Sequence, residues 1–358
     1  MKNRLGKVFK VMLLTLTLVL MYSINVSAAS GQASIGRKNY ATVQKALTAV
    51  KNGQTIKLNQ DITVTKTLVS KKNVTYTFDM NKHKIISKVA DENDGTFDII
   101  AGKVTILNGT LNGTIFTEKG ATLTVNGGTY QQIINSGKTV VNNGKIVNKK
   151  YSAFCNYGGS LVIKKATVKA RYNCVYGEKG TVTINGGTFG NYDRTCNYPV
   201  IYSEKATINL KGGTYADSYI QNVVGIVYNN KGKVTISGGK YMGDCGAIMN
   251  YSFMTIKGGT FTSENSYVLY CGANSTTSIT GGKFIGGAYG SVIEVRSPRK
   301  KFSMTGGSID VRMKGSAVVC YNNKNNFTLD TKKVKITGDR WENVSVRHIG
   351  VTYSGNKE

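Results

Sequence analysis

A short phrase built around two adjacent glycines recurs along most of this 358-residue chain. Each copy begins with an alternating, strand-like run, continues with the glycine pair and a polar residue, and usually ends on an aromatic residue. The clearest copies lie at residues 124–130, 183–189, 209–215, 235–241, 255–261, 278–284 and 303–309. With weaker copies included, the residue after the turn recurs at a mean spacing of 22 between positions 110 and 308. Such a period indicates a repeat protein, in which each unit buries its apolar side chains by stacking on the next.

The residues within one period predict strands rather than helices. Each period holds two strand-like runs and no helical spacing of apolar residues. A leucine-rich repeat has a similar length, but its Leu-x-x-Leu-x-Leu pattern is missing, and a propeller blade is about twice as long. Connections between parallel strands are right-handed in about 98% of cases. We therefore predict an all-β fold, a right-handed parallel β-helix (β-solenoid) with coils of about 22 residues.

The N-terminal part of the repeat region predicts a short capping helix. Val43, Ala46, Leu47 and Val50 have the spacing of an amphipathic helix, and a strand follows at residues 55–58. A solenoid end needs a cap, because its strand edge is otherwise open to pairing. Residues 41–58 resemble the N-terminal cap and first coil of the pectin-lyase-like superfamily of right-handed parallel β-helices. The resemblance covers the chain from about residue 39 to residue 340.

This resemblance implies the fold and leaves the chemistry open. The superfamily includes polysaccharide lyases, glycosidases, phage tailspikes and surface adhesins. The Gly-Gly-Thr-Phe/Tyr repeats look like those of secreted or surface proteins of Gram-positive bacteria. An adhesin-like binding protein and a carbohydrate-active enzyme are both compatible with it.

The first 29 residues have the pattern of a secretory signal peptide. Four Lys or Arg residues precede an apolar run at 11–21, and small residues give a cleavage site after Ala28 or Ala29. An uncleaved membrane anchor is the alternative, although the run is shorter than the ~20 residues of a membrane span. We expect a secreted protein, extracellular or associated with a cell surface, without stable membrane insertion. The expected organisation is a signal peptide at 1–29, a cap and first strand at 30–60, the β-helix at 61–340 and a C-terminal cap or tail at 341–358.

The charge of the chain points to polyanionic partners. The chain has 47 Lys and Arg against 19 Asp and Glu, a net charge of +28, and +24 remains without residues 1–29. A basic face attracts polyanions in a salt-dependent way. Acidic polysaccharide, a teichoic-acid-like polymer and nucleic acid all qualify as partners, and secretion favours the first two over nucleic acid.

Several kinds of site are excluded by missing residues. His83 and His348 lie near opposite ends of the chain and no Cys-x-x-Cys occurs, so we predict no metal site. A phosphate-binding Gly-x-x-x-x-Gly-Lys-Ser/Thr loop is also missing, which excludes nucleotide chemistry of that type. We expect no cofactor.

Two columns of equivalent residues are candidate ligand-binding sites. Lysines recur before the second strand of each coil and form a candidate cationic edge, whose central members are Lys179, Lys205 and Lys231. The alternative is an edge that only keeps the protein soluble. Tyrosines share a second column with Asn156, Asn250 and Glu294, and the tyrosines are Tyr176, Tyr202, Tyr228 and Tyr270. Their rings suit contact with sugars, or alternatively a surface ladder that covers the strands.

Catalytic candidates are sparse. Glu178 and Glu204 hold equivalent places on adjacent coils, ~5 Å apart along the backbone, which is close to the ~5–5.5 Å between the carboxyl groups of retaining glycosidases. Each is followed by Lys, so the alternative is a solvated corner with its own counter-ion. Asp193 and Arg194, in a loop with two tyrosines, are the candidates for a lyase acting on uronic acids.

These patterns together favour binding over catalysis. The chain lacks the acidic clusters that calcium-dependent lyases and polygalacturonase-type hydrolases need. We predict a secreted, adhesin-like protein that binds acidic glycans or cell-surface polymers through a cationic edge of the β-helix. The alternative is a polysaccharide lyase or glycoside hydrolase that acts on acidic polysaccharide.

Two further expectations concern the interior. The aromatic residues after the glycine pairs are expected to point inward and stack, rather than to form a sugar-binding stripe. Secretion allows disulfides, but the six cysteines occupy different positions in the coil, and we expect most of them to be buried thiols.

Overall fold

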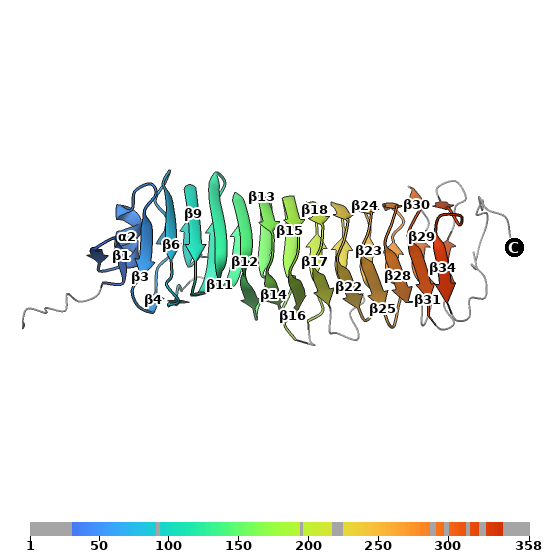
Figure 1. Ribbon diagram of the computed structural model, residues 1–358, viewed down its shortest axis with the longest axis horizontal. Coiled ribbons are helices and arrows are strands. Elements are labelled where there is room, and N and C mark those ends of the chain that lie inside the picture. The colour runs from blue at the N-terminus through green and yellow to red at the C-terminus, as the bar shows by residue number, and fades with distance from the viewer. Residues whose placement is uncertain are drawn as a thin grey trace, which may run out of the picture.

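The computed structural model describes residues 31–90, 94–193, 196–216, 225–286, 291–296, 301–312, 316–321 and 327–338. The predicted signal peptide, residues 1–29, and the predicted C-terminal cap or tail, residues 341–358, lie outside this part of the chain. Within it the chain forms a right-handed parallel β-solenoid of about 22-residue coils, which confirms the predicted fold class. Figure 1 shows the coils stacked into a rod, from the blue N-terminal end to the red C-terminal end.

Each coil supplies one strand to each of three parallel sheets, and the chain passes through them in the order C, A, B. Sheet A holds the strands that precede the glycine pairs. They are β3 (Thr55–Leu58), β6 (Thr75–Asp79), β9 (Gly102–Leu107), β11 (Ala121–Asn135), β12 (Lys138–Asn148), β13 (Phe154–Ile163), β15 (Val175–Ile184), β18 (Thr207–Leu210), β21 (Lys233–Ile236), β24 (Phe253–Ile256), β27 (Thr276–Ile279), β30 (Phe302–Met304) and β33 (Phe327–Leu329). Several of these strands are long enough to turn a corner and belong to two sheets.

Sheet B follows the glycine pairs and sheet C completes the coil. Besides parts of β11 and β12, sheet B holds β4 (Ile62–Val64), β7 (Lys84–Ser87), β10 (Thr110–Thr117), β14 (Thr167–Ala170), β16 (Thr188–Asn191), β19 (Thr214–Ala216), β22 (Lys240–Gly243), β25 (Thr260–Ser263), β28 (Lys283–Gly286), β31 (Ser308–Val311) and β34 (Lys335–Gly338). Besides parts of β10, β11, β13 and β15, sheet C holds β5 (Leu68–Val69), β8 (Phe97–Ile99), β17 (Ile201–Ser203), β20 (Val227–Asn229), β23 (Ile248–Asn250), β26 (Leu269–Cys271), β29 (Ser291–Arg296) and β32 (Ser316–Tyr321).

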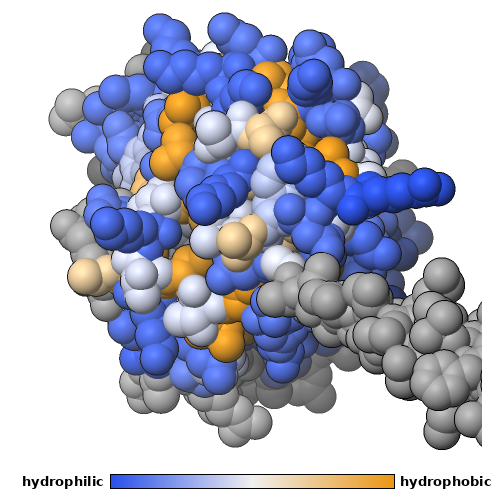
Figure 2. Space-filling view, turned by 90° about the vertical axis from the view of Figure 1, so that its left-hand side faces the viewer, coloured by the Kyte–Doolittle hydropathy of each residue, from blue (hydrophilic) through white to orange (hydrophobic). Residues whose placement is uncertain are grey.

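The N-terminal end is capped by a hairpin and a short helix. Strand β1 (Ala33–Ile35) pairs antiparallel with β2 (Lys38–Tyr40) and with β3, which occupies the first strand edge of the solenoid. Helix α2 (Val43–Ala49) begins where Thr42 Oγ1 accepts a hydrogen bond from the backbone N–H of Lys45 at 3.2 Å. Figure 2 looks at this end, where hydrophilic residues surround smaller apolar patches. The predicted capping helix is confirmed.

The aromatic residues after the glycine pairs are buried and stack along the solenoid axis, as predicted. Tyr215 lies 5.0 Å from Phe189 and 4.7 Å from Tyr241 between ring centroids, and Tyr241 lies 4.9 Å from Phe261. The hydroxyls of Tyr215 and Tyr241 donate to the carbonyl of the first glycine of their own turn, at 2.8 and 2.9 Å. This pairing satisfies the only polar atom that each ring buries.

Buried asparagines form a second internal ladder at the corner between sheets C and A. Asn135 Nδ2 donates to Asn156 Oδ1 at 2.7 Å, and Asn229 Nδ2 donates to Asn250 Oδ1 at 2.8 Å. All four side chains are buried, and Asn250 Nδ2 also donates to Thr277 Oγ1 at 2.9 Å. Hydrogen bonds from coil to coil therefore hold this corner, where an unpartnered amide would be costly.

The position of these asparagines corrects one expectation from the sequence. Asn156 and Asn250 were expected in the outward column of tyrosines, and this is wrong. The register of sheet C pairs Tyr176 with Cys155 and Tyr228 with Met249, so the asparagines lie one residue further on. A shift of one residue along a strand moves a side chain to the opposite face of the sheet.

Five of the six cysteines are buried free thiols: Cys155, Cys174, Cys196, Cys271 and Cys320. Burial raises the pKa of Cys155 and of Cys320 to about 11 in each case. These cysteines pack as small apolar residues, as the sequence predicts.

Candidate functional site

The tyrosines of sheet C form a stacked outward ladder. The ring centroids of Tyr176 and Tyr202 lie 5.5 Å apart and those of Tyr202 and Tyr228 lie 5.4 Å apart, with interplanar angles of 8° and 12°. Met249 takes the next place in the column, and Tyr251 from the following turn covers Tyr228 at 5.2 Å. Tyr270 continues the ladder, and Glu294 follows it in register, as expected.

This geometry limits what the ladder can bind. Rings that are nearly parallel and ~5 Å apart cover one another's faces, so each central ring presents an edge to solvent. The ring of Tyr202 has a neighbour on both faces, and its hydroxyl donates to Glu204 Oε2 at 2.8 Å. Face-on stacking of a sugar along the middle of the ladder is therefore blocked by the ladder itself.

Glu178 and Glu204 lie at the corner between sheets C and A, each beside a lysine. Glu178 Oε1 lies 3.6 Å from Lys179 Nζ, and Glu204 Oε1 lies 3.7 Å from Lys231 Nζ on the next coil. Hydrogen bonds from Asn230 and Tyr202 lower the pKa of Glu204. A carboxyl group held in this way stays ionised, which does not suit the general acid of a glycosidase.

The three predicted lysines of this corner carry little uncompensated charge. Lys179, Lys205 and Lys231 are exposed, but Glu178 and Glu204 share the corner with them and pair with two of the three. The five side chains together have a net charge of +1. These side chains therefore account for little of the chain's net charge of +28.

The candidates for lyase chemistry are only partly described. Arg194 lies outside the described residues. Asp193 accepts hydrogen bonds from Arg171 Nη1 at 3.1 Å to Oδ1 and 3.3 Å to Oδ2, and the thiol of Cys196 lies 3.5 Å from Oδ1. This arrangement brings together a cation and a carboxylate from successive coils.

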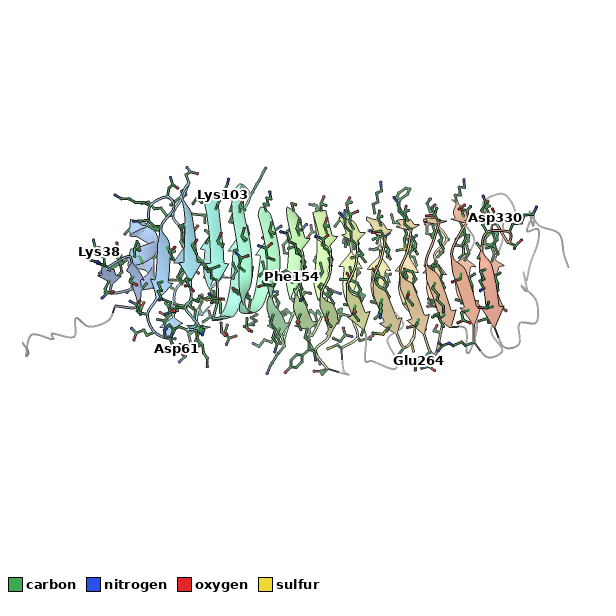
Figure 3. All side chains as sticks on the ribbon, viewed as in Figure 1. Lys38, Asp61, Lys103, Phe154, Glu264 and Asp330 are labelled. Atoms are coloured by element: carbon green, nitrogen blue, oxygen red, sulfur yellow. The ribbon has the colours of Figure 1, made fainter. Side chains whose placement is uncertain are left out.

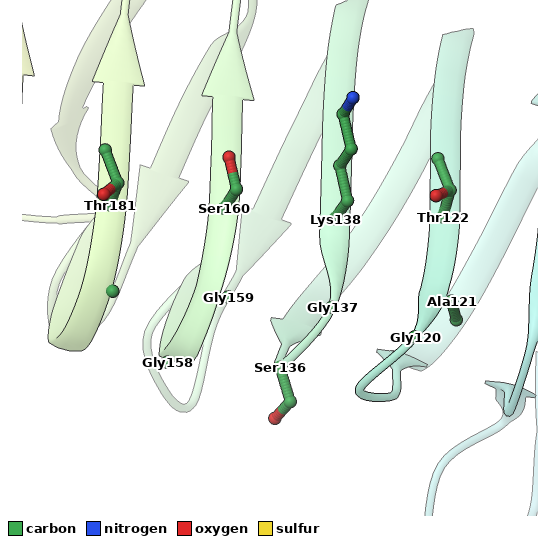
Figure 4. Close-up of a pocket in the computed structure, with 11 residues that line it drawn as sticks. Gly120, Ala121, Thr122, Ser136, Gly137, Lys138, Gly158, Gly159, Ser160 and Thr181 are labelled. Atoms are coloured by element: carbon green, nitrogen blue, oxygen red, sulfur yellow. The ribbon is translucent and has the colours of Figure 1, made fainter.

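A shallow hollow of about 460 Å³ lies at the start of the sheet A strands of four successive coils. Figure 4 shows glycines from each turn together with Thr122, Ser136, Lys138, Ser160 and Thr181. Glycine is required here, because a Cβ on Gly180 would lie 2.2 Å from the carbonyl oxygen of Gly159. Lys138 is the one titratable side chain among the lining residues, so the hollow has no acid–base pair.

No group of three or more His, Cys, Asp or Glu side chains that could hold a metal ion occurs in the described part of the chain. Among the same residues, no helix is long and apolar enough to cross a membrane.

Lysines without acidic neighbours gather at the corner between sheets A and B, which we call the glycine-pair corner. It comprises residues 142–145, 164–167, 185–188, 211–214, 237–240, 257–260 and 280–283. These segments contain no Asp or Glu and seven exposed lysines: Lys145, Lys164, Lys165, Lys211, Lys240, Lys257 and Lys283. Lys283 has Asp310 at 3.9 Å. The other six have no carboxylate within ion-pair distance in the part of the chain that the structure describes.

Backbone hydrogen bonds hold the turns of this corner in register from coil to coil. The N–H of Lys211 donates to Ile184, that of Ser237 to Leu210 and that of Lys257 to Ile236, each at 2.7 to 2.8 Å. Equivalent positions on successive coils are therefore ~4.8 Å apart. From Lys211 to Lys283 the lysine lies alternately before and after the glycine pair, and a hydroxyl residue takes the other place. Figure 3 shows side chains projecting along the whole length of the rod.

The glycines themselves keep this corner narrow. The second glycine of the turn has a positive φ, +106° at Gly213, and a Cβ on Gly212 would lie 2.6 Å from the carbonyl oxygen of Asn185. In the turn at Gly212 and Gly213, only the two flanking positions can therefore carry a long side chain. The sequence signal was available, since the lysines directly flank the repeated glycine pair, but their lack of counter-ions depends on how the coils stack.

Comparison with known proteins gave no match to a family model, a curated protein or a solved structure.

Proposed function

We propose that this protein is a secreted, adhesin-like protein that binds acidic polysaccharide or a teichoic-acid-like polymer along the glycine-pair corner. One observation carries the proposal: six exposed lysines without a carboxylate partner in the described part of the chain follow one corner of the rod, on five of six successive coils. A linear polyanion can lie along this corner and meet several ammonium groups at once. Each exposed contact is weak, about 0–1 kcal/mol, but contacts on one rigid scaffold add up.

The proposal also includes membership of the pectin-lyase-like superfamily and secretion from the cell. The capping helix, the coil length and the inward stack of rings support membership of the pectin-lyase-like superfamily. The basic leader and apolar run of residues 1–29 support secretion. Among the possible polyanions, extracellular polymers fit a secreted protein better than nucleic acid.

The surroundings of the catalytic candidates support binding rather than catalysis. Glu204 accepts hydrogen bonds that favour its ionised form, and Asp193 is hydrogen-bonded to Arg171. A polysaccharide lyase or glycosidase instead needs a base and an acid that can exchange protons near neutral pH.

The test compares two sets of charge reversals on the secreted chain. One variant carries Lys211→Glu, Lys240→Glu and Lys257→Glu at the glycine-pair corner. The matched control carries the same three changes at Lys179, Lys205 and Lys231, the edge predicted from the sequence. Binding to an immobilised acidic glycan and to immobilised poly(glycerol phosphate) is measured between about 50 and 500 mM salt. Over this range the electrostatic screening length falls from over ~10 Å to under ~5 Å.

The first variant should lose binding to both polymers. The control changes the net charge by the same amount but at a different corner, so it should retain most of the binding. Binding by the parent protein should collapse at high salt. Salt-insensitive binding, or equal binding by parent and first variant, would show that the corner is only solubilising. A larger loss in the control would move the site to the edge with Lys179, Lys205 and Lys231.

A further inference from the structure

The loops that lead from sheet B to sheet C bring exposed and half-buried aromatic and charged side chains together on three successive coils. We call this group the loop cluster, and it consists of Lys149, Arg171, Tyr172, Tyr192, Asp193 and Tyr198. It lies at a different corner from the glycine-pair corner, because it follows sheet B instead of preceding it.

The rings of the loop cluster are arranged differently from those of the tyrosine ladder. Tyr172 and Tyr198 lie 4.4 Å apart between centroids with an interplanar angle of 39°, and Tyr151 meets Tyr172 edge-on at 6.0 Å and 71°. Tyr198 is 44% exposed and Tyr151 is 40% exposed. The tilt stops the rings from closing into a continuous stack, so the outer ring keeps accessible surface at which an apolar face of a sugar can pack.

Buried asparagines hold the loops in place. Asn148 Oδ1 accepts hydrogen bonds from the backbone N–H groups of Lys150 and Tyr151, and Asn148 Nδ2 donates to the carbonyl of Ser152. Asn173 Nδ2 donates to the carbonyl of Pro199 at 2.6 Å, next to Tyr198. The exposed side chains therefore project from backbone that is fixed from inside the solenoid, which is the condition for a preorganised site.

Charged groups lie beside these rings. Asp193 Oδ1 and Oδ2 accept from Arg171, which joins two coils, and Lys149 Nζ lies over the ring of Tyr192 at 5.5 Å from its centroid. Two cations and one carboxylate give the loop cluster a net charge of +1. The cluster thus combines apolar ring surface with hydrogen-bond donors, one carboxylate acceptor and a positive balance.

The size of the loop cluster selects the kind of ligand. Three successive coils span two coil steps, about 10 Å, which suits one or two sugar rings. A stable protein interface needs about 800 Å² on each partner, far more than three loop tips supply. The positive balance favours a sugar that bears an anionic group.

We propose that the loop cluster is a binding site for a single sugar ring with an anionic substituent, separate from the polymer-binding corner. Tyr198 and Tyr172 pack against the ring, Asp193 and Arg171 hydrogen-bond its hydroxyls, and Lys149 attracts the anionic group. This site would recognise one residue or one end of a glycan, whereas the lysines of the glycine-pair corner contact a polymer along its length.

The experiment titrates the secreted chain with methyl β-glucuronide and with the neutral methyl β-glucoside, followed by NMR. These monosaccharide probes are too short to span the lysines of the glycine-pair corner. The variants are Tyr198→Ala and its ring-preserving partner Tyr198→Phe. Tyr157→Ala is the matched control, because Tyr157 is 43% exposed and meets Tyr176 of the tyrosine ladder edge-on, away from the loop cluster. Lys149→Gln tests the charge preference.

We expect saturable millimolar binding of the glucuronide, weakened about tenfold by Tyr198→Ala, which corresponds to about 1.4 kcal/mol. Tyr198→Phe and Tyr157→Ala should bind within about twofold of the parent, and Lys149→Gln should bind both sugars alike. The Lys211, Lys240 and Lys257 reversals should leave this titration unchanged, so the two sites can fail separately. Lack of saturation by either sugar, or an equal loss in Tyr157→Ala, would overturn the proposal.

Discussion

Truncation of Phe261 tests whether the internal ring stack is the core of the solenoid. The Phe261 ring is fully buried, with Tyr241 at 4.9 Å on one face and Phe284 at 4.9 Å on the other. Replacement by Ala removes the ring and leaves a cavity, which costs about 3–5 kcal/mol for a buried Phe. Both neighbouring rings are carried by strands that pair in register with β25, so the cavity cannot collapse easily. We therefore expect a cost of about 4–5 kcal/mol, at the upper end of that range.

The measurement is urea unfolding followed by circular dichroism and by tyrosine fluorescence. Coincidence of the two transitions is required, because long repeat arrays can lose cooperativity. Phe253→Ala is the matched control, since Phe253 lies in the preceding strand, β24, and is 50% exposed. This change should lower the free energy of unfolding by at most about 1 kcal/mol. Equal destabilisation by the two changes would refute the assignment of the ring stack as the core.

Three further predictions concern buried groups. Thiol titration in denaturant without reductant should find six reactive thiols, and the native protein should react slowly because burial raises the pKa of Cys155 and Cys320; bridges found by mass spectrometry would contradict this. Burial, together with Cys155, raises the pKa of Tyr157 to about 12, so the neutral form is favoured by folding. Its contribution to stability is complete below pH ~10 and is lost as the pH rises towards about 12, which an alkaline series of unfolding curves would detect; equal stability across this range would contradict it. Asn250→Leu should destabilise the protein by about 1–3 kcal/mol, because Asn229 Nδ2 and Thr277 Oγ1 lose their buried partner; an unchanged urea midpoint would show that the asparagine ladder is dispensable.

The sequence was sufficient for the fold because the period, the glycine pairs and the inward aromatics all repeat. The apolar pattern placed Asn156 and Asn250 one residue away from their true register in sheet C, because both are polar and nevertheless buried. Their burial depends on an amide partner in the adjacent coil, which hydrophobic patterning cannot show.

The candidate sites were less predictable than the fold, because they depend on neighbours distant in sequence. Lys231 pairs with Glu204 on the preceding coil, and this pairing reduces the charge of the edge that the sequence favoured. Tyr172 and Tyr198 are separated by 26 positions but meet because each lies three residues before the paired Val175 and Ile201 on successive coils. Such contacts follow only once the lengths of individual coils are placed in three dimensions.

The alternation of lysine and hydroxyl residues across the glycine pair repeats every two coils, and this repeat constrains changes in the number of coils. Lys211 and Lys257 lie on the same side of the turn, two coils apart, with Ser237 between them. Loss of the single intervening coil would place the two ammonium-bearing positions ~4.8 Å apart, with a repulsion of about 1 kcal/mol in water. Loss of two consecutive coils would restore the alternation. Coils should therefore be gained or lost in pairs more readily than singly, because only a change by two coils avoids placing two lysines on the same side of adjacent turns.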